Sequence, residues 1–132
     1  MHRFYRDVWN GWDDRAVDAL LAPGFALRGS LGDEAHGREG FRAYRDKVHA
    51  AFGDFHNEVR ELIVDGERAA VRLTCTGRHD GEILGLAPTG ARVAYEAAAF
   101  FRTEGGYLQE AWVLGDLDGL RAQLTAAPRD DA

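Results

Sequence analysis

The chain is poor in cysteine and contains no long apolar run. A single cysteine, Cys75, stands among 132 residues, which excludes an internal disulfide framework and a cysteine-rich zinc site. No apolar stretch approaches the roughly 20 residues that span a bilayer. The opening segment, MHRFYRDVWNGWDD, lacks the apolar core of a signal peptide. We therefore expect a cytoplasmic protein with no membrane partner.

Basic clusters and common cofactor motifs are also missing. Acidic residues outnumber basic ones, 22 to 16, and the arginines are scattered, so we expect no nucleic-acid partner. The sequence contains no GxxxxGK[ST] loop, no GxSxG elbow and no HxxxH pair. The glycine-rich segment Gly77–Gly90, GRHDGEILGLAPTG, leads into a strand pattern rather than a helix. We expect no metal and no cofactor, because metal ligands would have to come from distant segments.

The pattern that is present changes along the chain from helical spacing to alternation. Helices are predicted over residues 4–12, 13–21, 37–53 and 116–124, and strands over residues 25–31, 56–64, 68–79, 91–103 and 106–115. Helices followed by antiparallel strands are typical of an α+β domain whose helices cover one face of a curved sheet. We predict one domain over residues 1–132, with a pocket between sheet and helices and a tail disordered from about residue 126.

His79 is one candidate for the pocket. Along its strand it shares a face with Val71, Leu73 and Cys75, because side chains alternate between the two faces. Since the apolar face should point inward, we expect His79 at the rim of the pocket. There it could hydrogen-bond a ligand oxygen or relay a proton. The alternative is a histidine whose hydrogen bonds are satisfied within the fold.

Asp116 is the second candidate. Glu110, Trp112, Leu114 and Asp116 share one face of the last strand. A carboxylate buried beside a tryptophan would have a raised pKa, which suits general acid or base work. The alternative is that Asp116 caps the helix that follows it. The residue pattern does not choose between the two roles.

Aromatic residues are numerous and several fall on the elements that should wall the pocket. We predict that Tyr5, Trp9, Tyr44, Tyr95 and Trp112 contact a flat or apolar ligand. Cys75, in the middle of a strand, is expected to be a buried packing residue rather than a nucleophile.

Two segments together resemble the SnoaL-like polyketide cyclases. GRHDGEILGLAPTGARV is similar to the family signature G-x-H-x-G-x-x-x-G-[IL]-x-P-T-G-x-x-V, and GGYLQEAWVLGDLDGLRAQL is similar to its closing segment. The N-terminal FYRDVWNGWDDRAVDALLAPGF and the later GREGFRAYRDKV resemble the family's first helices. The likeness thus covers nearly the whole chain.

The resemblance implies a cone-shaped fold like that of nuclear transport factor 2, with helices packed on a strongly curved antiparallel sheet that encloses a pocket. It also implies a homo-oligomer, a dimer or tetramer. In the cyclases an aspartate at the position of Asp116 is the acid/base for an intramolecular aldol closure of an aromatic polyketide, and the motif histidine corresponds to His79. No metal, flavin or nicotinamide is required.

The sequence departs from the family where many members carry a histidine before the last tryptophan, since Ala111 stands there. Two alternatives therefore stay open. One is a non-catalytic module that binds a small hydrophobic ligand. The other is a relative with hydroxylase or epoxide-hydrolase chemistry, for which Glu96 or Glu110 would supply a second carboxylate.

Overall fold

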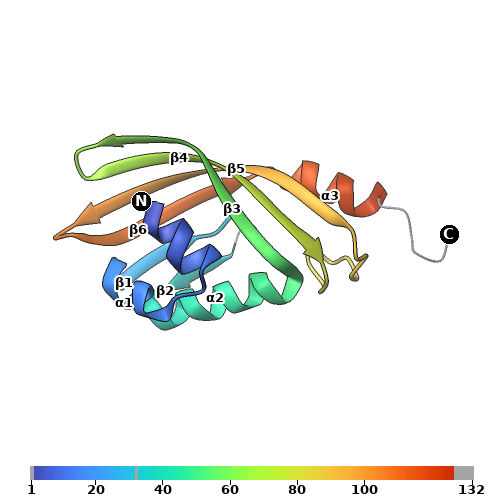
Figure 1. Ribbon diagram of the computed structural model, residues 1–132, viewed down its shortest axis with the longest axis horizontal. Coiled ribbons are helices and arrows are strands. Elements are labelled where there is room, and N and C mark those ends of the chain that lie inside the picture. Colours follow the sequence, from blue (N-terminus) through green and yellow to red (C-terminus); the bar gives the residue numbers. More distant parts are fainter. Residues whose placement is uncertain (1, 32, 127–132) are drawn as a thin grey trace.

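The structure is a computed structural model that describes residues 2–31 and 33–126. One sheet and four helical segments make up this part of the chain (Figure 1). In chain order they are η1 (Phe4–Asn10, a π-helical segment), α1 (Asp14–Leu20), β1 (Leu21–Arg28), β2 (Glu34–His36), α2 (Gly37–Ala51), β3 (Phe52–Asp65), β4 (Arg68–His79), β5 (Arg92–Glu104), β6 (Tyr107–Gly115) and α3 (Leu117–Ala126). The predicted α+β class is confirmed.

The six strands lie in the order β2-β1-β6-β5-β4-β3. Long hairpins join β3 to β4 at the Asp65–Gly66 turn and β5 to β6 at the Glu104–Gly106 turn. The pairing of β1 with β6 is parallel, which differs from a wholly antiparallel sheet. No hairpin constrains these two strands, because most of the chain separates them. The three-residue β2 is too short to leave an alternating pattern in the sequence, and it was not predicted.

Two register shifts bend β3 over the helical layer. They fall between Gly53 and His56 and between Val59 and Glu61, and such bulges bend a strand and increase its twist. At the first shift Asp54 adopts a positive φ of 52°. Its carboxylate accepts hydrogen bonds from Arg78 N at 3.2 Å and from Arg92 Nη1 at 2.9 Å. These bonds hold the bend against the neighbouring strands.

The concave face of the sheet and the helices beneath it enclose the core (Figure 1). Alternate residues of β4, including Val71, Leu73 and Cys75, are buried, as their shared parity predicts. The helical layer contributes Phe4, Tyr5, Val8 and Trp9 from η1 and Phe41, Tyr44 and Val48 from α2. Each large apolar side chain buried in this way stabilises the fold by about 1.5–3 kcal/mol.

Two side-chain amides attach helices to the backbone of the sheet. Asn10 Nδ2 donates to Asn57 O at 2.8 Å, and Asn10 Oδ1 accepts from Asn57 N at 2.9 Å, so η1 is fixed to β3. Gln123 makes the same pair of bonds with the backbone of Ala94, at 2.6 and 3.0 Å. Because β6 pairs with β5 only from Ala97 onward, Gln123 takes the place of a strand partner there.

Within residues 2–31 and 33–126, no helix combines the length and the apolar character needed to cross a membrane. The tail predicted to be disordered falls almost wholly on residues 127–132, which lie outside the described part of the chain.

Candidate functional site

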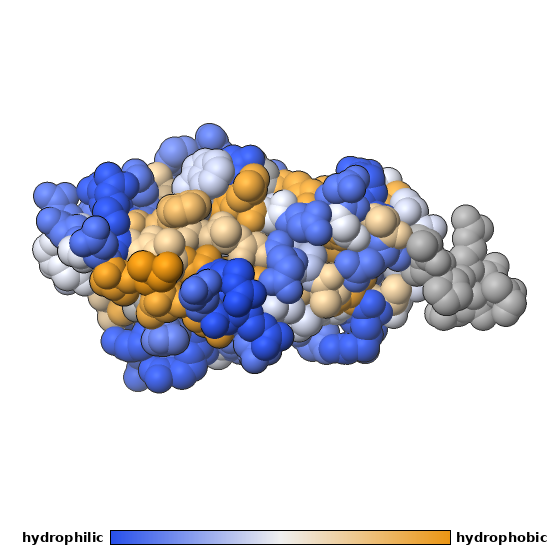
Figure 2. Space-filling model, turned by 90° about the horizontal axis from the view of Figure 1, so that it is seen from above, coloured by the Kyte–Doolittle hydropathy of each residue, from blue (hydrophilic) through white to orange (hydrophobic). Residues whose placement is uncertain are grey.

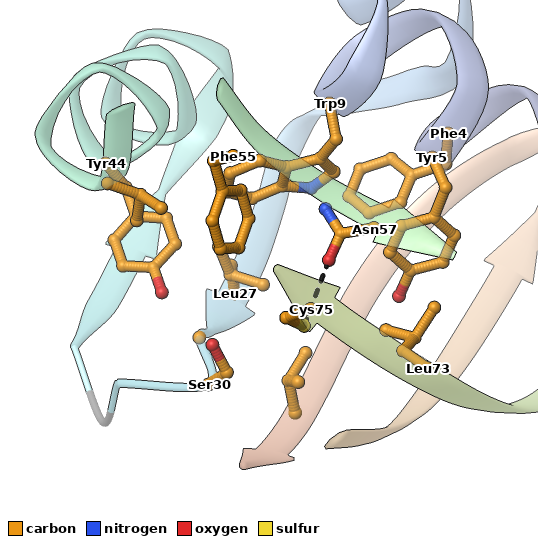
Figure 3. A pocket seen from close by; sticks show the side chains of 13 residues that line it. Phe4, Tyr5, Trp9, Leu27, Ser30, Tyr44, Phe55, Asn57, Leu73 and Cys75 are labelled. Carbon is orange, nitrogen blue, oxygen red and sulfur yellow. Dashed lines mark hydrogen bonds between the residues drawn. The ribbon is translucent and has the colours of Figure 1, made fainter. Parts of the chain in front are cut away.

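A small cavity lies between η1, α2 and the concave face of the sheet (Figure 3). Its volume is about 30 Å³. Apolar and aromatic side chains form most of the wall, and a few polar groups face inward among them. The lining residues are Phe4, Tyr5, Trp9, Leu27, Gly29, Ser30, Tyr44, Val48, Phe55, Asn57, Leu73, Cys75 and Val113. Tyr5, Trp9 and Tyr44 therefore lie where the sequence predicts them, on the elements that wall a pocket.

The aromatic wall is braced by edge-to-face contacts. Trp9 packs against Phe41 with ring centroids 5.6 Å apart and planes at 82°, and against Tyr44 at 6.0 Å and 87°. Phe4 packs in the same manner on Phe101 of β5, at 5.5 Å and 74°. Each ring is thus held by a neighbour behind it, in the geometry that aromatic pairs prefer. The wall presents a preformed apolar surface rather than a loose one.

Three hydroxyl groups, two from buried tyrosines and one from a half-buried serine, gather at one end of the cavity. Ser30 Oγ lies 3.0 Å from Tyr95 Oη in a hydrogen bond, and the Tyr44 hydroxyl lies against the neighbouring Gly29. We call Ser30, Tyr44 and Tyr95 the hydroxyl cluster. Residue 29 must be glycine for this arrangement, because a Cβ there would collide with the Tyr44 hydroxyl. Tyr95 is not among the residues that line the cavity, and it contacts the wall through its hydrogen bond to Ser30.

Burial keeps the phenols of the hydroxyl cluster neutral. It raises the pKa of Tyr44 to about 12, although hydrogen bonds from Leu31 and Ser30 act in the opposite direction. Burial also raises the pKa of Tyr95 well above its usual value. Phenols that stay protonated at pH 7 can donate hydrogen bonds to a carbonyl or enolate oxygen. The cluster is therefore suited to a ligand oxygen that carries negative charge.

Cys75 and Asn57 form the second polar pair of the wall. The Cys75 thiol donates to Asn57 Oδ1 over 3.2 Å, shown as a dashed line in Figure 3. Burial raises the pKa of the Cys75 thiol to about 12. A thiol that stays protonated is a poor nucleophile, which agrees with the prediction of a packing residue.

His79 is fully buried but does not line this cavity, so its predicted place at the pocket rim is wrong. Its Nδ1 accepts a hydrogen bond from Thr89 N at 3.2 Å and lies 3.0 Å from Thr89 Oγ1. The backbone of His79 pairs with Gly90 and Ala91 at 2.9 and 2.8 Å. His79 thus closes the glycine-rich loop onto its P-T-G turn. The alternative of a histidine satisfied within the fold holds for Nδ1 only, because Nε2 is buried without a hydrogen-bond partner among the described residues.

Trp112 lies on the convex face of the sheet with 44% of its surface exposed, so the prediction that it lines the pocket is wrong. Its neighbours Ala111 and Val113 face the core instead. The shared face of Trp112 and Leu114 was recognised, but that face points outward. The misassignment arose because both faces of β6 carry apolar residues, so hydrophobicity alone does not identify the inner one.

Asp116 is exposed at the end of β6 and caps α3. Its Oδ1 accepts a hydrogen bond from Gly119 N at 2.9 Å, and its backbone oxygen accepts from Leu120 N at 3.0 Å. Asp116 does not line the cavity, so its predicted place within an apolar pocket is wrong. It does stand close to the hydroxyl end, because the preceding Gly115 packs against Ser30 and Tyr95.

Several lining residues were missed from sequence. Asn57 shares its strand with charged residues and Ser30 stands among glycines, so neither carries a pattern that points to a pocket. None of the described lining residues is an Asp, Glu or His. In the part of the chain that the structure describes, no three His, Cys, Asp or Glu side chains gather so as to hold a metal ion.

Comparison with known proteins gives the family. The family model for SnoaL-like polyketide cyclases matches residues 1–124. None of the curated proteins matches the chain. Among solved structures, TsrD from Streptomyces laurentii is 31% identical, with a TM-score of 0.82 and coverage of 96% of this chain and 92% of that one.

Two other structures are similar. IdmH from Streptomyces antibioticus, described as a candidate polyketide cyclase, is 26% identical, with a TM-score of 0.80 and coverage of 95% of both chains. A Catenulispora acidiphila protein with a ketosteroid isomerase-like fold is 18% identical, with a TM-score of 0.79 and coverage of 94% and 90%. It supports the fold alone. The match over residues 1–124 and the likeness to TsrD show that this chain belongs to the SnoaL-like polyketide cyclase family.

Proposed function

We propose that this protein binds a polyketide-like aromatic ligand in the cavity and promotes an intramolecular aldol closure without a cofactor. The observation that carries the proposal is the meeting, in one cavity, of edge-to-face aromatic walls and the hydroxyl cluster. Aromatic walls suit a flat ligand, and neutral hydroxyl groups suit its carbonyl oxygens. The relative described as a candidate polyketide cyclase supports the same ligand class.

The proposed reaction requires the protein to remove one proton, stabilise an enolate and return a proton. A carbon between two carbonyl groups loses a proton, and the resulting enolate attacks a second carbonyl carbon of the same chain. A carbon–carbon bond forms and the new alkoxide takes up a proton, so substrate and product are isomers. Negative charge grows on the enolate oxygen, where donors such as Tyr44 and Ser30 stabilise it more strongly than they stabilise the neutral carbonyl.

The size of the cavity sets a condition on ligand entry. A volume of about 30 Å³ accommodates about one water molecule, whereas small-molecule pockets measure roughly 300–1,000 Å³. The cavity must therefore open before a polyketide enters. The element best placed to move is η1, which contributes Phe4, Tyr5 and Trp9 to the lining. Closure over the ligand would then fold it into a reactive conformation.

In this proposal Asp116 carries the proton. Its carboxylate is exposed and stands one residue beyond Gly115, which packs against Ser30 and Tyr95. To act as acid or base, the carboxylate must leave the amide of Gly119 and turn toward the hydroxyl cluster. His79 keeps only a supporting role, since its bonds to Thr89 shape the loop that precedes β5.

A non-catalytic binding function is the second candidate. It is favoured by the lack of any Asp, Glu or His among the described lining residues. In this case the same walls and hydroxyl groups hold a small hydrophobic ligand and no proton is transferred. Binding is common to both candidates, whereas ring closure belongs only to the first.

Binding is tested with a hydroxyanthraquinone as the probe, followed by quenching of tryptophan fluorescence. We expect Tyr44→Phe to weaken binding about three- to tenfold, the effect of losing one net hydrogen bond. The matched control is Tyr107→Phe, because Tyr107 is exposed at the start of β6 and does not line the cavity; the affinity of this variant should match that of the wild type. Equal affinities for all three proteins would contradict the role of the hydroxyl cluster.

Catalysis is tested with a linear aromatic compound that carries two 1,3-dicarbonyl units. The proposal expects the protein to convert it to a cyclic isomer, which chromatography separates from the starting compound. Binding of this compound with no increase in the rate of closure would support the binding-only function instead.

A further inference from the structure

Two N–H donors of the cavity wall have no acceptor among the described residues. One is Nδ2 of Asn57, a residue that is 5% exposed, and the other is Nε1 of Trp9, which is 7% exposed. Within the described part of the chain, the one bond of the Asn57 side chain runs from the Cys75 thiol to Oδ1. Buried donors without an acceptor cost free energy and call for an explanation. We call the two N–H groups the donor pair.

Neither nitrogen of the donor pair is sealed inside the protein. Among the described residues, the side-chain nitrogen atoms that are both fully enclosed and unpartnered belong to Arg45, His49 and His79. Asn57 Nδ2 and Trp9 Nε1 are not in this group, so each has free surface, and both residues line the cavity. The donor pair therefore faces the space that we assign to the ligand.

The fold fixes the direction of the Asn57 amide. Asn57 of β3 pairs with Cys75 of β4, and residues directly opposite each other on antiparallel strands point to the same face. Because the thiol donates to Oδ1, the amide oxygen turns toward Cys75 and the NH2 group turns away from it. Figure 3 shows this arrangement, with the amide nitrogen on the side of the Trp9 indole. The backbone of Asn57 is held as well, by the two bonds of Asn10.

The donor pair and the hydroxyl cluster are two separate polar sites in one cavity. The donor pair comes from η1 and β3, whereas Tyr44 comes from α2 and Ser30 from the segment after β1. In Figure 3 the hydroxyl groups of Tyr44 and Ser30 lie on one side of the cavity and the Asn57 amide lies on the other. A ligand that satisfies both sites needs two acceptor oxygens.

The donor pair suits an oxygen on which negative charge develops. An amide and an indole both keep their protons near pH 7, and no Asp or Glu among the described lining residues competes for them. Solvent is kept away, because both residues are buried and, in Figure 2, closely packed side chains cover the outer face of the sheet. N–H groups aimed at a developing oxyanion are worth most in such a site, from which water is excluded.

We propose that Asn57 and Trp9 bind the carbonyl oxygen that is attacked during ring closure, while the hydroxyl cluster binds the enolate oxygen. This assignment rests on the proposed function. As the enolate carbon forms the new carbon–carbon bond, the π electron pair of the attacked carbonyl moves onto its oxygen. The donor pair stabilises this alkoxide until it takes up a proton. The substrate class is thereby narrowed to compounds with two carbonyl groups that reach both sites at once, and Cys75 is a positioning residue for the Asn57 amide.

Two probes that differ only in their carbonyl oxygens separate this role of Asn57 from a packing role. Anthraquinone carries two carbonyl groups on opposite edges of its central ring, and anthracene carries none. We expect Asn57→Leu, which keeps the branched shape and removes the amide, to weaken binding of anthraquinone about three- to tenfold and to leave binding of anthracene unchanged. Equilibrium dialysis measures both affinities. Equal weakening for both probes would assign Asn57 to packing and overturn the proposal.

Two further variants identify which proposal fails. Gln109→Leu removes an amide that does not line the cavity, and it should bind both probes like the wild type. Tyr44→Phe removes a donor of the hydroxyl cluster, and its effect should multiply with that of Asn57→Leu in the double variant, because each substitution removes a bond to a different carbonyl. If Tyr44→Phe weakens binding of anthraquinone and Asn57→Leu does not, only the role of the donor pair is overturned. If the wild type does not bind anthraquinone, the proposed function fails with it.

Variants of Cys75 test the donor pair without changing Asn57, and far-ultraviolet circular dichroism checks that every variant is folded. Cys75→Ala frees the amide to turn over. We expect it to bind anthraquinone about twofold more weakly, because about half of the molecules then present N–H groups to the ligand. Cys75→Ser keeps a donor for Oδ1 and should bind like the wild type. Equal affinities of Cys75→Ala and Cys75→Ser for anthraquinone would contradict the positioning role and overturn this part of the proposal.

Discussion

Asp116 combines, in one side chain, a helix cap that the structure shows and an acid/base role that remains a proposal. The two roles can be separated because asparagine caps a helix about as well as aspartate, whereas alanine does not. An amide, unlike a carboxylate, cannot take up the proton of a carbon acid near neutral pH. Substitution at this one position can therefore remove the base while keeping the cap.

We expect Asp116→Asn to unfold at nearly the same temperature as the wild type and to lose ring closure. Asp116→Ala should lose ring closure and also about 1 kcal/mol of stability, because the amide of Gly119 loses its acceptor. Urea unfolding and the chromatographic assay measure the two effects. If Asp116→Asn closes the ring at the wild-type rate, Asp116 acts only as a cap.

The hydroxyl cluster should make stability depend on alkaline pH. Burial raises the pKa of Tyr44 to about 12, whereas a tyrosine in the unfolded chain has a pKa of about 10. The unfolded chain therefore loses this proton first, and stability falls as pH rises from about 10 towards 12. Below that window both states are protonated and the effect is absent.

Urea unfolding over this alkaline range should show that the free energy of unfolding falls as pH rises. Tyr44→Phe should make this fall less steep by about 1.4 kcal/mol per pH unit, the effect of one proton, where the unfolded tyrosine is fully ionised. Tyr107→Phe is again the control, since the Tyr107 ring is 42% exposed. An unchanged slope in Tyr44→Phe would show that Tyr44 titrates alike in both states.

At the scale of elements, the proposed opening of the cavity depends on η1, which contributes Phe4, Tyr5 and Trp9 to the lining. Three contacts hold it: the paired bonds of Asn10 to the backbone of Asn57, a bond of 3.2 Å from Arg45 Nη1 to Val8 O, and its aromatic residues in the core. Arg45 also pairs with Asp14 at the start of α1. Movement of η1 must break the Asn10 bonds, and we expect it to expose the thiol of Cys75, which lines the cavity.

Labelling of Cys75 with a thiol reagent should therefore report the opening of η1. We expect Asn10→Ala to label roughly 5- to 30-fold faster than the wild type, since lost hydrogen bonds worth about 1–2 kcal/mol favour the open state. Gln123→Ala removes the equivalent amide from α3 and should label at the wild-type rate. Equal acceleration in both variants would indicate general loosening instead of movement of η1.

At the scale of the whole molecule, the dimer that the family resemblance implies would link stability to concentration. Folded chains that pair are stabilised by mass action. We expect the midpoint of thermal unfolding to rise with protein concentration in the wild type and to be independent of concentration in Phe100→Glu, because Phe100 is 54% exposed on the convex face of the sheet. Differential scanning fluorimetry over about two decades of concentration tests this. A midpoint independent of concentration in the wild type would contradict the dimer.

Sequence periodicity was sufficient to predict the α+β class, because the spacing of the apolar residues shows which side chains are buried, and this spacing changes from helical to alternating along the chain. It identified Tyr5, Trp9 and Tyr44 as cavity residues, since helices facing a sheet must bury one stripe. It failed for Trp112, because alternation separates the two faces of β6 but does not say which one is inner. For His79 and Asp116 the deciding contacts, with Thr89 and Gly119, are hydrogen bonds that leave no periodic signal.

The amide pairs made by Asn10 and Gln123 have a consequence for how copies of this protein can assemble. An unpaired strand backbone is a template on which another chain can polymerise. Asn10 occupies the free backbone groups of Asn57 on β3, and Gln123 occupies those of Ala94 where β6 has ended. Both positions are thereby closed to an incoming strand. We therefore expect this protein to resist growth into a fibre through these two strand backbones.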